Sequence, residues 1–437
     1  MNKTHQAVVE GLSHDGRGVV KHDEKVYFVP QALPGEKIEF EPFKKRRGQF
    51  SGKLVEVLVA SPHRIKPECE YFGTCGGCSL QHLSVDQQIS YKEKTLIDNL
   101  ARIGNVVPDN ILSSVTGDDW YYRRKARPGV KYVPKKGGVL VGFREPGSHY
   151  LTSLRHCKTL DRRLSGLLDP IHELVSKLSC YQQIPQIEFA AADNATALVL
   201  RHLQPFLEQD LDFLRDFAQQ YQVHLYLQPK GLNSIHPLWP VEPEPLFYLL
   251  PQFGLQMQFS ATDFVQINRQ VNEALIDLAI TLLEPASSDR VLDLFCGLGN
   301  FTLPLATSGA EIVGVEGEQS LVNKGVNNAK LNQIDNVEFK QIDLFGDSTM
   351  DLAASEFTKV LLDPPRSGAL KVVTDLIPEI QPRRIVYVSC NPSTLARDAG
   401  VLVHQHGYRL THAGAIDMFP HTAHVESIAV FTRKKDL

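Results

Sequence analysis

The chain has 437 residues, of which 43% are hydrophobic and 22% are charged. This composition excludes a wholly disordered or low-complexity protein, and the length predicts about three domains. No apolar run is long enough to span a membrane, and the first residues lack the apolar core of a secretory signal, so we expect a cytoplasmic protein.

The net charge of −4 argues against a nucleic-acid-binding protein when the chain is taken as a whole. Two segments are nevertheless basic. Residues 1–66 contain 12 Lys and Arg against 8 Asp and Glu, including the run Lys44-Lys45-Arg46-Arg47. Residues 120–165 contain 12 against 2. A short run of cations is usually a solvated surface, but so dense a segment favours contact with a polyanion.

Residues 1–57 predict a small β-barrel domain. The expected strands are Ala7–Val9, Gly18–Val20, Val26–Val29, Lys37–Phe40 and Leu54–Val57. Turn signals such as Pro34-Gly35 separate them. Five short strands in such a length are typical of an OB-like barrel, which often binds nucleic acid, and an SH3-like structural module is the alternative.

Seven cysteines follow, an odd number that does not indicate a disulfide framework. Three of them form the cluster Cys69-x5-Cys75-Gly76-Gly77-Cys78, and Cys157 is a candidate fourth ligand. Thiolates this close repel one another unless a cation holds them. Zinc sites usually use two short arms, whereas three near cysteines and a remote one are common in iron–sulfur proteins, so the spacing favours a cluster and leaves zinc open. We assign no role to Cys180.

Residues 58–262 predict an α+β region around these cysteines. The expected helices are Val85–Gly104, Asp161–Ser179 and Leu207–Tyr221. The expected strands are Tyr121–Val133, Gly138–Arg144, Ile187–Ala191, Thr196–Arg201 and His224–Gln228. The sequence does not predict a particular fold for this region.

Residues 263–437 alternate strands with helices, which predicts a doubly wound, Rossmann-like α/β domain. The expected strands are Arg290–Phe295, Glu311–Glu316, Asn336–Gln341, Lys359–Asp363, Arg384–Ser389, Tyr408–Asp417 and His424–Arg433. The last two favour an antiparallel pair at the end of the sheet.

The first of these strands runs into the glycine turn Gly297-Leu298-Gly299. Thr302 stands where a dinucleotide fingerprint has its third glycine, so a pyrophosphate ligand is not favoured. Glu316 at the next strand end can accept ribose hydroxyls, and Asp343 can bind an adenine amino group. Together these features indicate S-adenosylmethionine, and the alternative is that both acids merely cap loops.

Two further strand ends carry candidate chemistry. Asp363-Pro364-Pro365-Arg366 fixes a carboxylate between rigid residues, and Arg366 replaces the aromatic residue of amino-group methyltransferases, so amine methylation is not favoured. Cys390 is a candidate nucleophile and Glu426 a candidate general base. A cysteine at a strand end is more often a small core residue, but the neighbouring acids favour the nucleophile. Cys296, inside the glycine turn, suits packing better.

These motifs resemble the bacterial RNA uracil-C5 methyltransferase family, and the resemblance covers nearly the whole chain. The motifs are Cys69-x5-Cys75-Gly76-Gly77-Cys78, Asp293-Leu294-Phe295-Cys296-Gly297-x-Gly299, Asp363-Pro364-Pro365-Arg366, Ser389-Cys390-Asn391-Pro392 and Met418–Glu426. Residues Gly11–Gly18 resemble the start of a TRAM domain, an RNA-binding OB-like module.

The resemblance implies a TRAM barrel, a central domain with a 4Fe-4S cluster and a methyltransferase domain that uses S-adenosylmethionine. It implies that the cluster is held by Cys69, Cys75, Cys78 and Cys157. It implies that the cofactor and uracil sites are lined by Gln266, Phe295, Asn300, Glu316, Asp343 and Asp363. Cys390 would be the nucleophile and Glu426 the base.

Members with both the barrel and the cluster methylate carbon 5 of a uridine in 23S rRNA, so the resemblance implies uridine 1939 as the target. A second 23S rRNA uridine or a tRNA uridine is the alternative. The target base must be flipped out of any duplex, and Phe264 is a stacking candidate, with core packing as the alternative. The expected RNA contacts are Tyr122, Arg123, Arg124, Lys125 and Arg127. No membrane contact and no obligate protein partner are expected.

Two functions of other classes compete with this interpretation. A radical iron–sulfur enzyme usually spaces its cysteines as Cys-x3-Cys-x2-Cys, which this chain does not. A non-catalytic ribosome assembly factor would not need Cys390 or Glu426.

Overall fold

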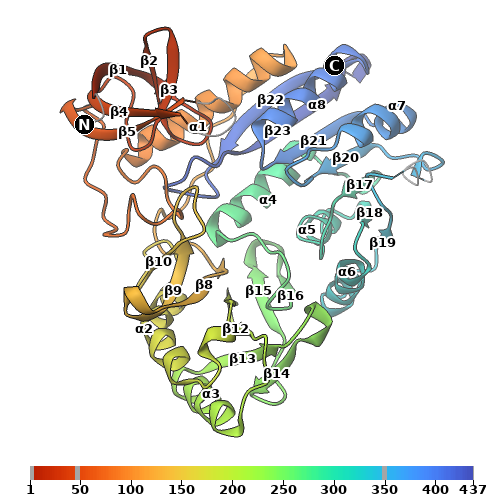
Figure 1. Cartoon of the computed structure of the whole chain (residues 1–437). Helices are drawn as coiled ribbons and strands as arrows, with labels where there is room; N and C mark the ends of the chain where they lie inside the picture. Colours follow the sequence, from red (N-terminus) through yellow and green to blue (C-terminus); the bar gives the residue numbers. More distant parts are fainter. Residues whose placement is uncertain (1–3, 45–49, 347–351, 437) are drawn as a thin grey trace.

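The computed structural model describes residues 4–44, 50–346 and 352–436 (Figure 1). Lys45, Arg46 and Arg47 of the basic run fall outside these ranges. Three regions of the chain form separate sheets around a common centre, with the N-terminal barrel and the C-terminal sheet at one end and the middle region at the other (Figure 1). Among the described residues, no helix is both long and apolar enough to cross a membrane.

The N-terminal region is a closed five-stranded barrel, which confirms the OB-like expectation. Its strands are β1 (His5–Leu12), β2 (Gly18–His22), β3 (Lys25–Val29), β4 (Lys37–Lys44) and β5 (Phe50–Val59), in the order β1-β2-β3-β5-β4. Alternate side chains such as Val9, Val20 and Phe40 fill the interior. A Cβ at Gly52 would lie 2.6 Å from the Phe40 ring, so glycine is required there for the barrel to close.

The C-terminal sheet is doubly wound, as predicted. Its order is β19-β18-β17-β20-β21-β23-β22-β6. The strands are β6 (Asn110–Ile111), β17 (Arg290–Leu294), β18 (Glu311–Glu316), β19 (Val337–Gln341), β20 (Lys359–Leu362), β21 (Arg384–Ser389), β22 (Tyr408–Ile416) and β23 (Glu426–Arg433). Strands β17 to β21 are parallel, and β23 pairs antiparallel with both β21 and β22, which confirms the expected final pair.

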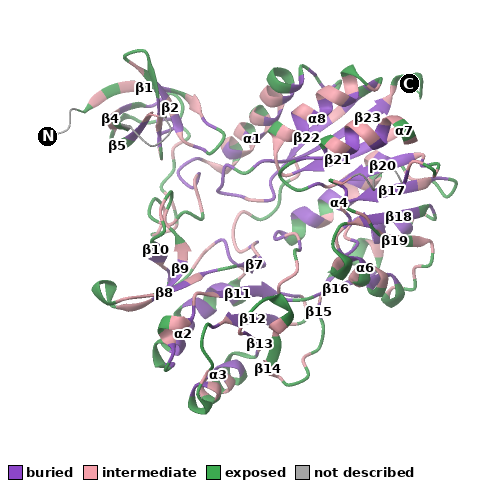
Figure 2. Cartoon of the chain, turned by 45° about the vertical axis from the view of Figure 1, so that its right-hand side comes forward, coloured by how far each residue is buried: buried purple, intermediate pink, exposed green. Residues whose placement is uncertain are grey.

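Helices cover both faces of this sheet. They are α1 (Val85–Asn99), α4 (Arg269–Leu283), α5 (Thr302–Ala306), α6 (Gln319–Leu331), α7 (Ile377–Ile380) and α8 (Pro392–His404). Consecutive strand residues face opposite sides, so Val291 packs with α4 whereas Leu292 packs with α1 and α8. The inner strands are buried along almost their whole length (Figure 2).

The middle region is a mainly antiparallel sheet with two helices on one face. Its strands are β7 (Lys125–Ala126), β8 (Gly129–Val133), β9 (Gly138–Arg144), β10 (Leu151–Ser153), β11 (Gln186–Ala191), β12 (Thr196–Arg201), β13 (Val223–Gln228) and β14 (His236–Trp239). The helices are α2 (Arg162–Lys177) and α3 (Glu208–Tyr221). Asp161 caps α2 by accepting from the Arg163 N–H. The single strand expected over Tyr121–Val133 is wrong, because Pro128 cannot donate to a ladder and separates β7 from β8.

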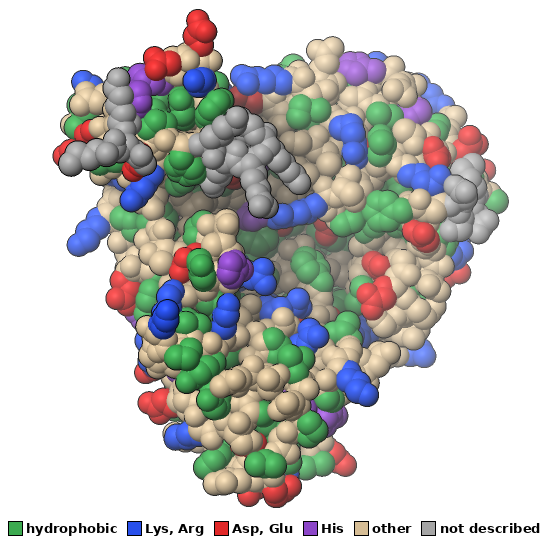
Figure 3. Space-filling model, viewed as in Figure 1, with side chains coloured by type: hydrophobic (Ala, Val, Ile, Leu, Met, Phe, Trp, Pro, Cys, Tyr) green, Lys and Arg blue, Asp and Glu red, His purple; other side chains and the backbone are tan. Residues whose placement is uncertain are grey.

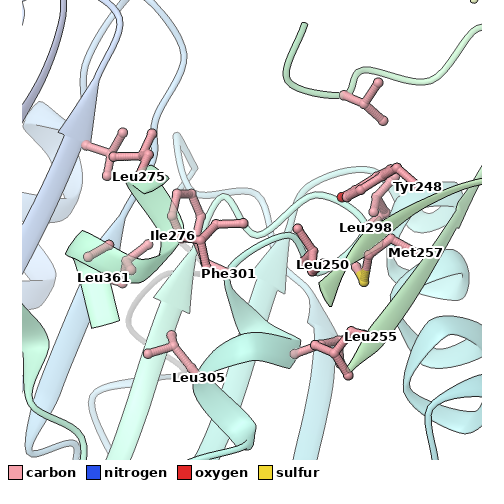
Figure 4. Packing of buried hydrophobic residues seen from close by; sticks show 14 of the residues in the cluster. Tyr248, Leu250, Leu255, Met257, Leu275, Ile276, Leu298, Phe301, Leu305 and Leu361 are labelled. Atoms are coloured by element: carbon pink, nitrogen blue, oxygen red, sulfur yellow. The ribbon is translucent and has the colours of Figure 1, made fainter. Parts of the chain in front are cut away.

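A hairpin that the sequence did not predict joins the middle and C-terminal regions. It consists of β15 (Leu246–Leu250) and β16 (Leu255–Phe259). Figure 4 shows its Leu250, Leu255 and Met257 beside Phe301 and Leu305, which lie at the start of α5 and within it. This shared apolar core holds the C-terminal sheet against the middle region.

Short helical turns complete the described structure. Pro134–Lys136, Tyr181–Gln183, Leu232–Ser234, Pro251–Phe253 and Lys434–Asp436 are 3₁₀ turns, and Leu100–Gly104 and Val372–Leu376 are π-helical. The first π-helical turn extends α1, which was expected as one helix over Val85–Gly104. Strand β6 pairs with β22, so the segment after the barrel belongs to the C-terminal sheet in space.

Candidate active site and cysteine cavity

The carboxyl ends of the parallel strands surround a cavity of about 610 Å³, here called the strand-end cavity. In an open α/β sheet this edge is where ligands bind. All eight residues predicted for the cofactor and the chemistry line it: Gln266, Phe295, Asn300, Glu316, Asp343, Asp363, Cys390 and Glu426. Residues far apart in the sequence thus meet in one place. The cavity can hold a nucleoside-sized ligand beside a thiol.

The glycine turn brings the backbone up to the cavity. Gly297 and Gly299 have φ values of 58° and 98°, a conformation that favours glycine. The Gly297 N–H donates to Glu316 Oε2 at 3.1 Å, and the Gly317 N–H donates to Oε1 at 2.8 Å. Glu316 therefore sits in a fixed position at the rim, with its remaining lone pairs available to a ligand.

The strand-end cavity is also lined by an amide of a hydrogen-bond network and by apolar side chains. Asn300 exchanges hydrogen bonds with Asn272 at 3.0 and 3.1 Å, and its Oδ1 also accepts from the Tyr248 hydroxyl at 2.9 Å. Phe295 and Phe345 rings lie 5.7 Å apart at the cavity edge. Polar groups that fix orientation within apolar walls are typical of a cofactor site.

Cys390 is placed by the turn that ends β21 and begins α8. Asn391 caps the helix by accepting from the Ser393 N–H at 3.1 Å, and Pro392 occupies the first helical position. The Asn391 side chain also donates to the Arg366 carbonyl at 3.0 Å. This bond ties the cysteine turn to the Asp363–Arg366 loop, so the thiol and the Asp363 carboxylate share one rigid frame.

Glu426 reaches the same cavity from the antiparallel edge of the sheet. It begins β23 and pairs with Ile416, while Ser427 pairs with Ser389 beside the nucleophile candidate. Its side chain is buried, and its Oε2 has no hydrogen-bond partner among the described residues. Burial raises the pKa of Glu426 to about 8, helped by the charge of Asp363 and opposed by Lys92 and Arg366. A buried acid with a free oxygen is the form expected of a proton acceptor.

The pKa values of the Cys390 thiol and of the nearby Asp363 carboxyl are also shifted. Burial raises the pKa of Cys390, the charges of Glu426 and Asp363 add to this, and Arg366 lowers it. Burial raises the pKa of Asp363 to about 7. The Arg366 guanidinium lies 2.8 Å from His424 Nδ1. Burial and this cation lower the pKa of His424, so its neutral ring accepts from Arg366. Arg366 is thus the cation that favours ionisation of Cys390.

The other four predicted ligands line a second cavity of about 250 Å³, called the cysteine cavity: Cys69, Cys75, Cys78 and Cys157. Burial is the main cause that raises the pKa of Cys75 to about 11, and burial together with the charges of the other three thiols raises the pKa of Cys78 to about 12. Among the described residues, no three of these sulfur atoms lie within 4.8 Å of one another. A zinc ion with Zn–S bonds of ~2.3 Å would hold its sulfurs roughly 3.8 Å apart, so the spacing is wide for a single zinc.

The predicted RNA contacts are partly wrong. Tyr122, Arg124 and Lys125 are buried. Arg124 pairs with Asp193 and Lys125 contacts the Asp263 carbonyl, because these cations lie where the middle sheet meets the C-terminal domain. Arg127 is 59% exposed and Arg123 is half-buried. Charge density alone could not separate buried cations from surface ones.

Phe264 and Cys296, two further residues considered from the sequence, also line the strand-end cavity. Phe264 is 74% exposed and lines the strand-end cavity, so core packing is wrong for it. Cys296 is buried within the glycine turn, and burial raises the pKa of its thiol well above the usual value, which agrees with packing. Lys92 of α1 was not predicted, because nothing in a single sequence marks a helical lysine as buried.

Relatives with known names resemble the whole chain. A protein named 23S rRNA (uracil(1939)-C(5))-methyltransferase RlmD from Cupriavidus metallidurans is 47% identical over 97% of this chain and 94% of its own length. One of the same name from Alkalilimnicola ehrlichii is 48% identical over 98% and 96%. The chain belongs to the RNA uracil-C5 methyltransferase family. The family model described as tRNA (Uracil-5-)-methyltransferase matches residues 250–435, which include every residue that lines the strand-end cavity except Tyr248.

A solved member shares the overall fold of this RNA uracil-C5 methyltransferase. The crystal structure of Pyrococcus abyssi tRNA (uracil-54, C5)-methyltransferase in complex with S-adenosyl-L-homocysteine aligns with a TM-score of 0.76 at 22% identity. The alignment covers 98% of this chain and 100% of the archaeal one. The barrel, the middle sheet and the C-terminal sheet therefore recur together.

Proposed function

We propose that this protein uses S-adenosylmethionine to methylate carbon 5 of a uridine in 23S rRNA, at the position equivalent to uridine 1939, and forms 5-methyluridine. The observation that carries the proposal is the convergence of Cys390, Glu426 and Asp363 on a cavity whose other end offers Glu316 and Asp343. The names of the full-length relatives support the substrate.

The proposed chemistry follows from what uracil lacks. Carbon 5 is a poor nucleophile, so the Cys390 thiolate first adds to carbon 6 and creates an enolate that is electron-rich at carbon 5. The bound cofactor supplies an electrophilic methyl group, which carbon 5 accepts. Glu426 then removes the proton from carbon 5. The electrons of that C–H bond form the C5=C6 double bond, and the C6–S bond breaks to restore the Cys390 thiolate.

Within the strand-end cavity, we assign cofactor contacts to the glycine-turn end. Glu316 would accept hydrogen bonds from the ribose hydroxyls, and Asp343 would accept one from the adenine amino group. The sides of the cofactor site would be formed by Phe295, Asn300 and Gln266. Asp363 would face both cofactor and uracil. The fit is supported by the fixed position of Glu316 and by the apolar walls between the two acids.

We propose that RNA enters from the barrel side. A neighbouring cavity of about 470 Å³ shares Arg366, Cys390 and His424 with the strand-end cavity and is also lined by His14 of the barrel and Asn99 of α1. Cys390 therefore lies between two openings. Figure 3 shows a hollow where the three regions meet, with Lys and Arg side chains around it. A flipped uracil could reach the thiol from this side while the cofactor occupies the other, with Phe264 as a stacking surface.

We also propose that the cysteine cavity holds a 4Fe-4S cluster and that its role is structural. Four thiols that face one another need a cation to ionise together, and a cubane with an iron behind each sulfur accepts wider spacing than zinc does. The segment after Cys78 hydrogen-bonds the loop that leads to Glu426: the Ser79 and Leu80 N–H groups both donate to the His421 carbonyl at 2.9 Å. A cluster there would hold the segment after the barrel, the middle sheet and the loop that leads to Glu426 in fixed positions relative to one another.

The remaining assignments complete the proposal. The barrel would act as a TRAM domain over residues 1–57, followed in sequence by the cluster-bearing region over 58–262, whose α1 and β6 pack on the C-terminal sheet, and by the methyltransferase domain over 263–437. Cytoplasmic ribosomal RNA would be the partner, without an obligate protein partner.

The experiment is a methyl-transfer assay with purified protein, labelled S-adenosylmethionine and 23S rRNA that lacks the modification. We expect label in 5-methyluridine at one position of the large-subunit RNA, and no label in tRNA. Label only in tRNA would contradict the substrate, and label in another nucleoside would contradict the chemistry.

A further inference from the structure

A buried lysine that the proposed chemistry does not use lies behind the base candidate. The Lys92 side chain, on α1, is 1% exposed. A buried ammonium costs several kcal/mol of desolvation unless it is well paired. Its Nζ lies 2.5 Å from Asp417 Oδ1 and donates to the Phe419 carbonyl at 2.9 Å. The position is thus fixed from two sides.

Both partners of Lys92 belong to the strand and loop that frame Glu426. Asp417 directly follows Ile416, the cross-strand partner of Glu426, and Phe419 lines the strand-end cavity. One turn earlier on α1, Gln88 accepts from the His421 N–H at 2.8 Å. The face of α1 that carries Gln88 and Lys92 is therefore held against the 417–424 loop, so the ammonium cannot move away.

The ammonium has three N–H donors, and among the described residues two meet acceptors at Asp417 and Phe419. Glu426 Oε2 is buried without a partner in that same part of the structure. Lys92 and Glu426 interact electrostatically: the charge of Lys92 lowers the pKa of Glu426, and the charge of Glu426 raises that of Lys92.

We propose that Lys92 is a positioning residue for Glu426, and that its buried ammonium increases the fraction of Glu426 in the ionised form, which removes the proton from carbon 5. This inference rests on the proposed function and deepens it. Lys92 takes no proton itself. The proton passes from carbon 5 to Glu426, and the electron pair of the broken C–H bond forms the C5=C6 bond as Cys390 leaves.

Several charged groups face Glu426 from the elements around it. They are Asp363 and Arg366 after β20, Cys390 after β21, Asp417 after β22, His424 before β23 and Lys92 from α1. Asp363 opposes ionisation of Glu426, Glu426 and Cys390 oppose each other's ionisation, and burial lowers the pKa of His424. Arg366 contacts His424 and is exposed to solvent, so Lys92 is the buried cation of this set.

The chain offers a matched control in Lys359. It is also buried and pairs with an aspartate, Asp289, at 2.8 Å, but it lies at the start of β20, away from the strand-end cavity. Lys92→Met and Lys359→Met each remove a buried cation. Only the first should change the protonation of Glu426.

The test compares both variants with the wild type in single-turnover methylation of 23S rRNA between pH 6 and 10. The methylation rate should rise with pH as Glu426 ionises. We expect Lys92→Met to move this rise to higher pH by one unit or more, so that the rate at pH 7.5 falls about tenfold and recovers at high pH. The methylated RNA–protein adduct should accumulate. Lys359→Met should keep the wild-type pH–rate profile even where its melting temperature falls.

RNA with 5-fluorouridine at the target separates adduct formation from proton removal. Fluorine takes the place of the proton on carbon 5 and a base cannot remove it, so the reaction stops at the methylated adduct. Lys92→Met should form the trapped adduct at the wild-type rate. Equal slowing of adduct formation and turnover at every pH would overturn the inference in favour of a structural tie. Absence of an adduct in the wild type would contradict the proposed function instead.

Asp417→Asn gives a second test that does not depend on the stability of the Lys92 variant. It removes the carboxylate that opposes the effect of burial and favours the charged form of Lys92, so Lys92 should lose its proton and the pH–rate profile should move to higher pH, as in Lys92→Met. A profile that stays in place or moves to lower pH would overturn the inference.

Discussion

Two cavities in this chain hold cysteine thiols, and they differ in what surrounds the sulfur. In the cysteine cavity, Cys78 interacts electrostatically with all three other thiols. In the strand-end cavity, the charged neighbours of Cys390 are Glu426, Asp363 and Arg366. Burial raises the thiol pKa in both places.

The partners therefore decide what each thiol can do. Four thiols facing one another can all ionise only around a multivalent cation, which makes them ligands. A single thiol beside a cation and a proton acceptor can ionise for attack and be released again. The role of a cysteine here follows from its neighbours and not from its exposure, since five of these thiols are all half-buried.

The largest effect should come from removing the thiol of the strand-end cavity, which we assign as the nucleophile and not as a metal ligand. Cys390→Ala should lower methyl transfer by about 10⁴-fold or more, because no other group can add to carbon 6. Cys180→Ala is the matched control, since Cys180 is buried outside both cavities and should leave the rate unchanged. Comparable losses in the two variants would contradict the assignment.

Removing the base should have the next largest effect. Glu426→Gln should slow turnover by about 10²–10⁴-fold and leave addition of Cys390 intact, so a methylated RNA–protein adduct should accumulate on denaturing gels. A variant that turns over slowly without any adduct would show that Glu426 acts before or during addition.

In the cysteine cavity, Cys78→Ala should affect the structure rather than the reaction. We expect loss of iron and of the visible absorbance of a cluster, together with a lower melting temperature and weaker RNA binding. The structural role would be contradicted by a cluster-free variant that folds and binds RNA normally but cannot methylate.

A smaller effect should come from the cofactor end. Glu316→Gln should raise the KM for S-adenosylmethionine by about tenfold and change kcat little, because it weakens charged hydrogen bonds to the cofactor. Glu318→Gln, an exposed neighbour, is the control. A fall in kcat at unchanged KM would argue that Glu316 acts in the reaction itself.

The smallest expected effect is on stability. The folded pKa of Glu426, about 8, lies above its unfolded value, so the folded state binds more protons and loses stability as pH rises toward 8. Glu426→Gln should remove that loss and melt a few degrees higher than the wild type at pH 9, but not at pH 4. Equal melting temperatures at pH 9 would contradict the raised pKa.

Strand periodicity and motif spacing are local signals, so the sequence alone predicted the barrel, the doubly wound sheet and the acids and thiols of both cavities, whereas Gln266, Phe295 and Asn300 came only from the family resemblance. The sequence did not predict the β15–β16 hairpin, whose role is to pack two regions together. It predicted RNA contacts at Tyr122, Arg124 and Lys125, because composition does not reveal that Asp193 lies opposite Arg124 and Glu188 opposite Lys125. Lys92 was missed for the same reason: its partner Asp417 is 325 positions away.

The most direct test of the account is to identify which cysteine bonds to RNA. Wild-type protein would react with 5-fluorouridine-substituted 23S rRNA fragment and S-adenosylmethionine, and the RNA-linked peptide would be mapped by mass spectrometry. We predict one linked peptide, with the bond at Cys390 and none at Cys69, Cys75, Cys78 or Cys157. A bond at any other cysteine, or methylation without any linked peptide, would contradict the division between nucleophile and ligand thiols.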